Sequence, residues 1–333
     1  MKEREYTISF EDGVFKEQFQ QFIQYKRGLG FKYSNSTVIV LSQLNKRLNA
    51  YHTGSPRLSK EIVDKLAERI SSEASATQVK RIGLLRHFAI FMNSMGYEAY
   101  VYPQLYKVNY SSGFSPCIFS QEQICAIIRA SDSLRNSANS PTYHLVWPAF
   151  VRVLYGCGLR LSEALRLKAM NVDLETGVLY IEKSKNNTSR YVPMSASLLQ
   201  YSVIYAEQMK LDMKGSGYFF PAPDNGRYAM TTAQFAIKKI YAMAGIPIMS
   251  NGRLPRVHDM RHTFSCHSLE RLRQQGFDLY YSLPILCTYL GHQGIRDTER
   301  YLRLPMFMFP SIIEAEQAAC DSIIPEVKID ENE

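Results

Sequence analysis

The 333-residue sequence lacks the features that mark secreted, metal-binding or membrane proteins. Its six cysteines are scattered: none forms a C-x-x-C pair, and no histidine lies at metal-ligand spacing from one. The first residues contain no apolar stretch of signal-peptide type, and no uncharged apolar run approaches the length of a membrane span. We therefore expect a reduced, cytoplasmic protein with no metal site, no cofactor and no membrane partner.

The charge balance points to a polyanionic partner. The formal net charge is +8, which favours nucleic acid before a membrane surface, although an ordinary basic enzyme would fit the charge alone equally well. Charged residues make up 21% of the chain and hydrophobic residues 46%, so the composition suits a folded protein with real cores. The length favours two domains.

Residues 1–98 are predicted to form a helical domain. Apolar residues recur at helical spacing in four stretches, which begin near residues 15, 35, 60 and 75. Basic side chains lie between the apolar ones, either as solvated faces of the bundle or as contacts to DNA phosphates. The candidate DNA-binding residues are Lys46, Arg47, Lys80, Arg81 and Arg86.

Helical periodicity is lost over residues 99–118, which we interpret as a linker. Residues 119–325 are predicted to form a second domain of α+β type. Alternation with period two predicts three strands, at 172–174, 177–182 and 189–194, among several helices, two of them at about 195–212 and 281–289. The expected fold is thus mainly α with a small three-stranded antiparallel sheet. The acidic tail, residues 326–333, is expected to be disordered.

One constellation in the second domain suits attack on a phosphodiester. His258 and Arg261 are three residues apart, so they share a helix face, and His292 is followed nine residues later by Tyr301. Cleavage without a metal needs a nucleophile, cations for the non-bridging oxygens and an acid for the leaving oxygen. An arginine fork matches two phosphate oxygens and stays charged. A second such arginine, Arg160, lies about a hundred residues upstream.

These segments resemble the motifs of the tyrosine recombinases, the phage integrase family. The family's G-L-R-x-S-E segment is matched by Gly158-Leu-Arg160-Leu-Ser-Glu163, and its H-x-L-R-H-T-F segment by His258-Asp-Met-Arg261-His-Thr-Phe. Its L-G-H segment, with the nucleophile nine residues on, is matched by Leu290-Gly-His292 and Tyr301. By motif the resemblance covers about residues 155–305, and by architecture roughly residues 14–320.

The family's lysine lies in a β-turn of G-K-x-x-K-x-R-x-V-P type, and here the match departs from the pattern. The segment Ser184-Lys185-Asn-Asn-Thr-Ser-Arg190-Tyr-Val-Pro193 keeps the R-x-V-P end, which fixes the register. Serine and asparagine replace the two glycines, and threonine replaces the second lysine. Lys185 is the matching lysine, and Lys183 is an alternative for the role.

The resemblance implies a role for each matched residue. Tyr301 attacks the phosphorus, forms a 3′-phosphotyrosyl link and frees a 5′-hydroxyl, while Arg160 and Arg261 hold the non-bridging oxygens. Lys185 protonates the leaving oxygen. His258 acts as acid or base near the nucleophile, and His292 donates a hydrogen bond to the phosphate. Glu163 orients Arg160.

The resemblance also implies partners and leaves alternatives open. The expected partner is double-stranded DNA with paired core sites, bound by a homodimer at each site and by a homotetramer in the synapse, with accessory directionality factors as a further option. Only about a dozen residues precede the first predicted helix, so we expect no arm-binding domain. The favoured role is integration, excision or transposition of a mobile element. Alternatives are a chromosome- or plasmid-dimer resolvase, a relaxing enzyme of type IB topoisomerase kind, and a catalytically silent DNA-binding protein.

Two neighbours of the motif residues are interpreted as structural. Tyr289 is nearer to His292 than Tyr301 is, but it lies in an apolar run, so we expect it to pack in the core. His262 follows Arg261 and is expected to support helix packing.

Overall fold

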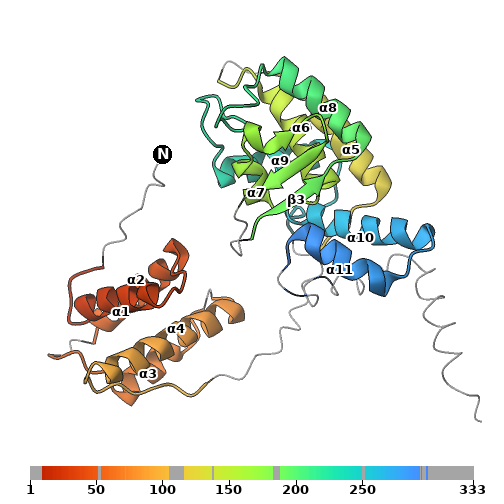
Figure 1. Cartoon of the computed structure of the whole chain (residues 1–333). Coiled ribbons are helices and arrows are strands. Elements are labelled where there is room, and N and C mark those ends of the chain that lie inside the picture. The colour runs from red at the N-terminus through yellow and green to blue at the C-terminus, as the bar shows by residue number, and fades with distance from the viewer. Residues whose placement is uncertain are drawn as a thin grey trace, which may run out of the picture. The chain divides into compact units, whose positions relative to one another are not determined.

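The chain folds into two compact units, Met1–Phe114 and Ser115–Glu333. The structure, a computed structural model, describes residues 10–51, 54–71, 73–104, 116–136, 139–182, 188–249 and 252–292, together with residues 294 and 298 (Figure 1). Over these residues the chain is mainly helical and has one three-stranded sheet, which confirms the predicted fold class at this level. The boundaries of the predicted domains stay predictions.

The described part of the first unit contains four helices, each close to a stretch predicted from helical spacing. They are α1 (Lys16–Gly28), α2 (Asn35–Asn49), α3 (Lys60–Ala67) and α4 (Ser75–Ser94). Ser59 caps α3 by accepting a hydrogen bond from the backbone N–H of Ile62. Three phenylalanines fill the centre, where the rings of Phe19 and Phe88 stack with centroids 3.9 Å apart and Phe22 packs edge-on against Phe88. Burial of these rings, together with the aliphatic side chains around them, stabilises the packing.

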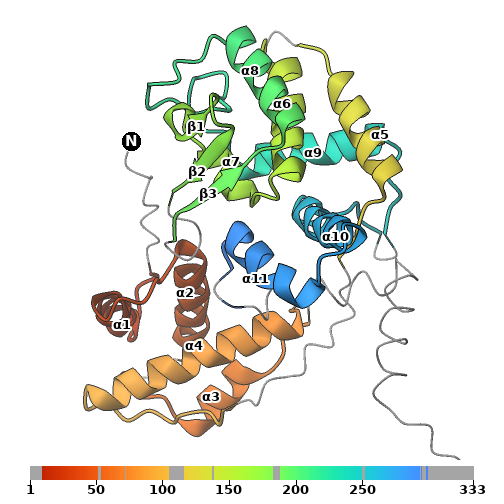
Figure 2. The same ribbon diagram turned by 45° about the vertical axis from the view of Figure 1, so that its right-hand side comes forward.

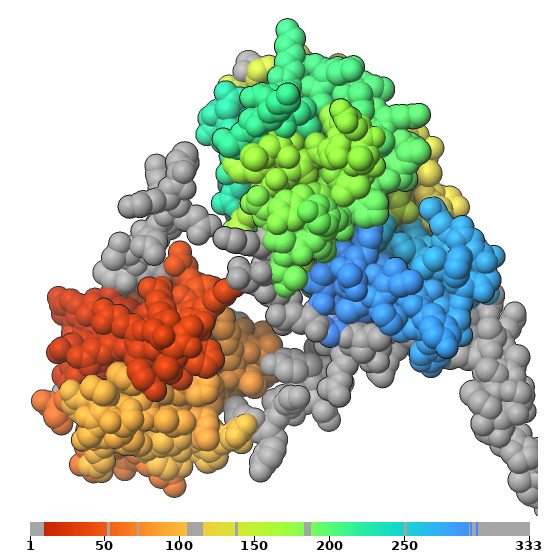
Figure 3. Space-filling model, in the orientation of Figure 1, coloured from red at the N-terminus to blue at the C-terminus, as the bar shows by residue number. Residues whose placement is uncertain are grey.

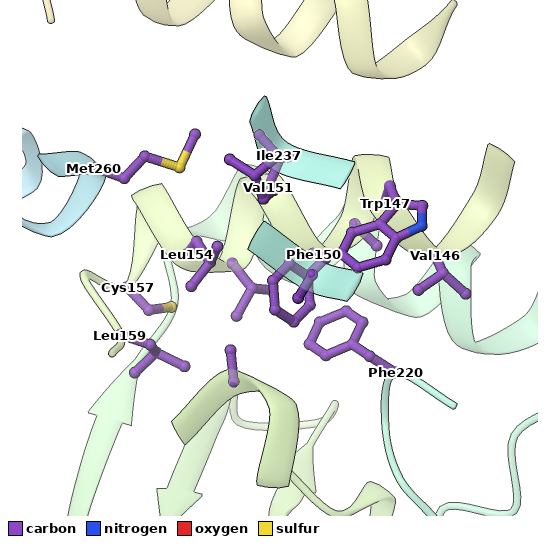
Figure 4. Close-up of a cluster of buried hydrophobic side chains, with 14 of the residues drawn as sticks. Val146, Trp147, Phe150, Val151, Leu154, Cys157, Leu159, Phe220, Ile237 and Met260 are labelled. Atoms are coloured by element: carbon purple, nitrogen blue, oxygen red, sulfur yellow. The ribbon is translucent and has the colours of Figure 1, made fainter. Parts of the chain in front are cut away.

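The second unit is built around one apolar helix, α6 (Tyr143–Gly156). Trp147, Phe150 and Leu154 of this helix are almost fully buried and pack with Phe220 and Ile237 (Figure 4). Helices α5 (Gln121–Asp132), α7 (Leu161–Arg166), α8 (Ala196–Gln208), α9 (Met230–Met243) and α10 (Asp259–Gln274) all contact α6. Helix α11 (Leu279–Leu290) packs against α10.

The sheet follows the predicted order of strands. Strands β1 (Val172–Asp173), β2 (Val178–Ile181) and β3 (Arg190–Pro193) pair antiparallel in sequence order and lie side by side in Figure 2. Ile181 pairs with Arg190, so these two residues flank the connection that carries Lys185. One face is buried, with Leu179, Ile181 and Val192 in the core. A short 3₁₀ helix, η1 (Ala169–Asn171), precedes β1.

Two helix ends differ from the prediction for local reasons. Helix α8 ends at Gln208 rather than near residue 212, because Lys210 adopts a positive φ of 51° that a right-handed helix cannot continue through. Helix α11 begins at Leu279, two residues earlier than expected, because the Asp278 side chain accepts hydrogen bonds from the N–H groups of Tyr280 and Tyr281. Among all the described residues, no helix has both the length and the apolar character needed to cross a membrane.

Candidate active site

Three segments that are far apart in the sequence meet in the second unit. They are the turn before α7, the start of α10 and the end of α11, which carry Arg160, Arg261 and His292. Strand β3 adjoins α11, and Figure 3 shows the surfaces of these two elements meeting. The three predicted residues therefore lie in one region of the protein, as a shared active site requires.

Gly158 sets the turn before Arg160. Its φ is +57°, and a Cβ at this position would lie 2.3 Å from a ring carbon of Phe264 on α10. No other residue fits this close approach without displacing the ring. The approach brings the carbonyl of Gly158 within 2.9 Å of the Arg261 Nη1 atom, which donates a hydrogen bond to it. The glycine of the first motif thus connects the turn to the arginine of the second motif.

Gly291 ends α11 in the left-handed conformation, with φ 66° and ψ 48°. This reversal turns two carbonyl groups toward the arginines. The Leu290 carbonyl accepts a hydrogen bond of 2.7 Å from Arg261 Nη2, and the Gly291 carbonyl accepts one of 3.2 Å from Arg160 Nη2. The end of α11 therefore holds both arginines through its backbone.

Arg261 is buried, with 1% of its surface exposed, and its guanidinium forms hydrogen bonds with other groups of the protein. Besides its bonds to the carbonyls of Gly158 and Leu290, its Nη2 lies 3.0 Å from His292 Nε2. The carbonyls of Gly158 and Leu290 hold the guanidinium of Arg261 in a fixed orientation before a phosphate binds.

The contact with Arg261 fixes the tautomer of His292. An arginine N–H can only donate, so His292 Nε2 must accept and the ring must be neutral. The proton is then on Nδ1, which donates a hydrogen bond of 2.9 Å to the hydroxyl of the buried Thr298. Arg261 and Thr298 thus orient the imidazole from its two sides.

Glu163 is the buried anion of the site. Its Oε1 accepts from Arg160 Nη1 at 2.7 Å, and its Oε2 accepts from the Arg160 backbone N–H at 2.9 Å. Burial alone would raise the pKa of this carboxyl. Hydrogen bonds and charge from Arg190, followed by the contacts of Arg160, outweigh burial and lower the pKa to about 2. Glu163 is therefore ionised at neutral pH and holds the Arg160 side chain by hydrogen bonds, while its role in orienting Arg160 for a phosphate stays a prediction.

Arg190 belongs to this cluster, although the sequence pointed to it only as a marker of register. It lies at the start of β3, is 9% exposed, and forms two hydrogen bonds to Glu163, at 3.1 and 2.9 Å. Its Nε donates a further bond of 2.7 Å to the Tyr289 carbonyl. The sequence does contain a signal for this role. The arginine of R-x-V-P falls at a strand position that faces the buried side of the sheet.

His258 is the N-cap residue of α10 and lies near the arginines of the cluster. Although the residue is exposed overall, desolvation of its ring and the positive charges of Arg261, Arg256 and Arg160 lower its pKa to about 4. The ring packs edge-on against that of His262, with centroids 4.7 Å apart. Burial, and then the neighbouring His258 and arginines, lower the pKa of His262 to about 3. Both imidazoles are neutral at physiological pH in the free protein.

We expect the His258 ring to stay about nine-tenths neutral or more between about pH 8 and about pH 5, because its pKa is lowered from 6.5 to about 4. Because folding lowers this pKa, protonation opposes folding, and the stability that His258 contributes is present above pH 6.5 and lost as the pH falls toward 4. NMR titration of the protein with labelled histidines, assigned with a His258→Gln variant, measures this. A midpoint near 6.5 would contradict the geometry of the cluster.

Tyr289 packs as expected and is not placed as a nucleophile. Its ring stacks on Phe264 with centroids 5.5 Å apart, and its hydroxyl donates a hydrogen bond to the Pro193 carbonyl. Burial raises the pKa of this phenol, so it stays protonated. Tyr289 is half-buried and packs against two hydrophobic clusters of this unit, in agreement with the expectation that it packs in the core.

Two residues with predicted catalytic roles, Lys185 and Tyr301, lie outside the described residues, as do the alternative Lys183 and the acidic tail. Their assigned roles stay predictions. The structure does describe the elements that flank them in sequence, namely β2 and β3 on either side of Lys185 and the segment up to Thr298 before Tyr301.

The five basic residues proposed for DNA contact differ in their environments. Lys46 and Lys80 are exposed on α2 and α4. Arg86 donates to the Tyr102 carbonyl at 2.6 Å, and Arg47 donates to backbone carbonyls of α3. Arg81 requires a correction: it is 4% exposed and is ion-paired with Glu73 at 2.7 Å, so it stabilises the bundle instead of offering its charge to DNA.

No cluster of three or more histidine, cysteine or carboxylate side chains able to hold a metal occurs in the described part of the chain. The five cysteines in that part are free thiols. Among the described residues, Arg160, Arg190 and Arg261 bring positive charge to Glu163.

Comparison with known proteins agrees with this geometry. The model of the phage integrase family matches residues 118–306. A putative integrase/recombinase, y4rB of Sinorhizobium fredii, is 29% identical over 87% of this chain and 92% of its own length. The tyrosine recombinase XerD of Rhizobium meliloti is 24% identical over 86% of this chain and 90% of its own.

Solved structures show the same fold. A XerH site-specific recombinase bound to its difH substrate superimposes with a TM-score of 0.62 at 18% identity, covering 90% of this chain and 94% of the other. The Tn1549 transposon integrase in complex with transposon right-end DNA gives a TM-score of 0.60 at 16% identity, covering 85% and 94%. The family match spans more than half of the chain, so this protein belongs to the phage integrase family. It is a tyrosine recombinase, an enzyme that cleaves and rejoins DNA strands.

Proposed function

We propose that this recombinase moves or integrates a mobile DNA element, and that Arg160, Lys185, His258, Arg261, His292 and Tyr301 carry out its chemistry. The observation that carries the proposal is the convergence of Arg160 and Arg261 on the end of α11. Arg261 contacts His292 directly, and Arg160 donates a hydrogen bond to the carbonyl of the adjacent Gly291. Two arginine forks beside an imidazole suit the non-bridging oxygens of one phosphodiester.

The proposed reaction gives each of these residues one task. The Tyr301 oxygen attacks the phosphorus, with His258 as acid or base near the nucleophile, and the bond to the 5′ oxygen breaks. Lys185 gives a proton to that oxygen, so the products are a 3′-phosphotyrosyl link and a 5′-hydroxyl. Attack by a 5′-hydroxyl of the partner duplex reverses the step and rejoins the strands. The covalent link keeps the bond energy, so the exchange requires no ATP.

His292 must change its hydrogen bonds to contact the phosphate. In the free protein its Nε2 accepts from Arg261. A phosphate oxygen that replaces the imidazole as the partner of Arg261 leaves Nε2 open to protonation, and a protonated ring donates from both nitrogens. The negative charge of the phosphate favours that protonation.

The first unit is proposed to contact the duplex through exposed basic residues of its helices, chiefly Lys46 and Lys80, with Arg47 and Arg86 as further contacts. A homodimer on each core site, a homotetramer in the synapse and accessory directionality factors complete the proposed assembly. We place the reaction on DNA in the cytoplasm.

A role in a mobile element is supported by the similarity to integrases and to a transposon integrase. The alternative, resolution of chromosome or plasmid dimers, is supported by the similarity to XerD. The two roles differ in where the enzyme acts. A mobile-element enzyme acts at the ends of the element that carries its own gene, whereas a resolvase acts at one fixed site elsewhere in the replicon.

Mapping covalent adducts on genomic DNA tests the role and the chemistry together. Cells expressing the tagged protein are lysed under denaturing conditions, DNA linked to the protein is recovered, and its ends are sequenced. We expect attachment at sites that flank the gene of this protein. Attachment at one distant site would support dimer resolution, and recovery of no linked DNA would contradict the proposed chemistry.

We expect binding to duplex DNA to weaken steeply with salt, because each phosphate contact releases counterions. With about 6–10 such contacts, affinity should fall by about 10³-fold or more between about 50 and 200 mM salt. Fluorescence anisotropy with a labelled duplex carrying the mapped site measures this. A flat response over that range would contradict a duplex held by many basic side chains.

A further inference from the structure

We propose that Arg190 is a positioning residue of the cleavage site. It neutralises Glu163, and thereby leaves the charges of Arg160 and Arg261 for the scissile phosphate. The inference rests on the proposed function, because it concerns how the same site meets a phosphate. The motif residues include Glu163 as the group that orients Arg160, and they leave open what balances the charge of that carboxylate.

The geometry assigns the arginine fork to Glu163. Arg190 Nη1 donates to Oε1 at 3.1 Å and Nη2 donates to Oε2 at 2.9 Å, so the guanidinium matches both carboxylate oxygens. Arg160 reaches the same carboxylate through one side-chain nitrogen, Nη1. Both Arg190 and Glu163 are buried, at 9% and 6% exposure, so their attraction is little screened by solvent.

The charges of the cluster explain why a third arginine is useful. Arg160, Arg190 and Arg261 surround a single carboxylate, which leaves the cluster with an excess of two positive charges. A phosphodiester carries one negative charge, and attack by a phenolate adds a second in the transition state. Excess charge of this size complements the transition state better than the ground state, and it is this difference that accelerates a reaction.

Without Arg190 the carboxylate would compete with the DNA. Arg160 Nη1 is already 2.7 Å from Glu163 Oε1, and Arg261 Nη1 is 3.8 Å from Oε2. A buried carboxylate that loses its bidentate partner requires other donors, since an unpaired buried charge is costly. Arg160 and Arg261 are the nearest donors, and each would then be drawn from the phosphate toward Glu163.

Arg190 also connects three elements of the site. It begins β3, and its Nε donates to the Tyr289 carbonyl near the end of α11. Its Cδ and Nη1 lie so close to Gly291 that a Cβ there would meet them at 3.1 Å. Gly291 in turn holds Arg160 through its carbonyl. One side chain thus ties together the strand that follows Lys185, the start of α7 and the C-terminal end of α11.

The test compares strand cleavage by Arg190→Gln, by Glu163→Gln with Arg190→Gln, and by wild type. The substrate is a nicked duplex carrying the mapped attachment site, on which the freed strand diffuses away and the adduct accumulates. Rates are measured at saturating protein, and DNA affinity is measured separately. The control is Arg152→Gln, which removes a second bidentate arginine, paired with Asp132 at 2.7 and 2.8 Å in the same unit.

We expect Arg190→Gln to bind DNA within about twofold of wild type and to form the adduct about 10²-fold more slowly, the effect of losing one preorganised contribution to the transition state. Removing the negative charge with Glu163→Gln in that background should restore at least about tenfold of the rate. Arg190→Lys keeps the positive charge but loses the planar guanidinium, so its cleavage rate should lie between those of Arg190→Gln and wild type. Arg152→Gln should cleave as wild type does.

Three results would overturn the inference. An Arg190→Gln protein with wild-type melting temperature and wild-type rate would show that the fork is dispensable. A double variant no faster than Arg190→Gln would show that Arg190 is only structural, since its partner's charge would then be irrelevant. If wild type itself forms no adduct, the proposed function fails and this inference with it. If wild type forms the adduct and Arg190→Gln equals it, the inference alone fails.

Discussion

Tyr301→Phe is expected to form no covalent adduct with DNA while binding the duplex as tightly as wild type. The substitution removes one oxygen atom, the proposed nucleophile, without which the phosphotyrosyl bond to Tyr301 cannot form. On a nicked duplex, wild type should accumulate a protein–DNA species that resists denaturation. Tyr301→Phe should show none within the detection limit of a denaturing gel.

The control for this change is Tyr281→Phe, which removes the hydroxyl of an 82% exposed tyrosine on α11. It should form the adduct at the wild-type rate. An adduct formed by Tyr301→Phe would move the nucleophile to another residue. Loss of the adduct in both variants would point to an effect on folding or binding instead of chemistry.

Arg261→Ala is expected to lower the rate of adduct formation by about 10³-fold, because it removes a preorganised cation from the developing charge. It should also destabilise the protein. The carbonyls of Gly158 and Leu290 would each lose a buried hydrogen bond, at a cost of about 1–3 kcal/mol each. Single-turnover cleavage, corrected for the folded fraction measured by thermal denaturation, separates the two effects.

Arg261→Lys and Arg273→Ala serve as controls. Lysine keeps the charge but not the planar fork, so it should fold better than the alanine variant and still cleave at least about tenfold more slowly than wild type. Arg273 lies on the same helix and pairs with Glu270, within the helix, at 2.9 Å. Its alanine variant should stay within about threefold of wild type. Wild-type cleavage by folded Arg261→Ala would contradict the role of this arginine.

The sequence predicted much of the site because its motifs encode local geometry that the fold then uses. The glycine before Arg160 is needed for a positive φ and for the approach of Phe264, and Gly291 is needed to end α11 in the left-handed conformation. Both features are local to their motifs. The three strands were likewise visible as alternation, because one face of the sheet is buried.

Other features depend on pairings that periodicity cannot reveal. Arg190 joins the site only because β3 lies beside α11, and its partners Glu163 and Tyr289 are 27 and 99 residues away. Arg81 was misassigned because a basic residue was taken to be exposed. Its spacing from Leu85 and Phe88 places it on the buried face of α4, and the ion pair that allows this burial cannot be read from periodicity. Its partner Glu73 lies in the loop before the helix.

A structure of the adduct on a nicked duplex tests the central claim most directly, by showing which atoms surround the scissile phosphorus. The account predicts a bond from the phosphorus to the Tyr301 oxygen, with the guanidinium groups of Arg160 and Arg261 and the imidazole of His292 on its non-bridging oxygens. A phosphorus bonded to another residue, or one that neither arginine contacts, would contradict it.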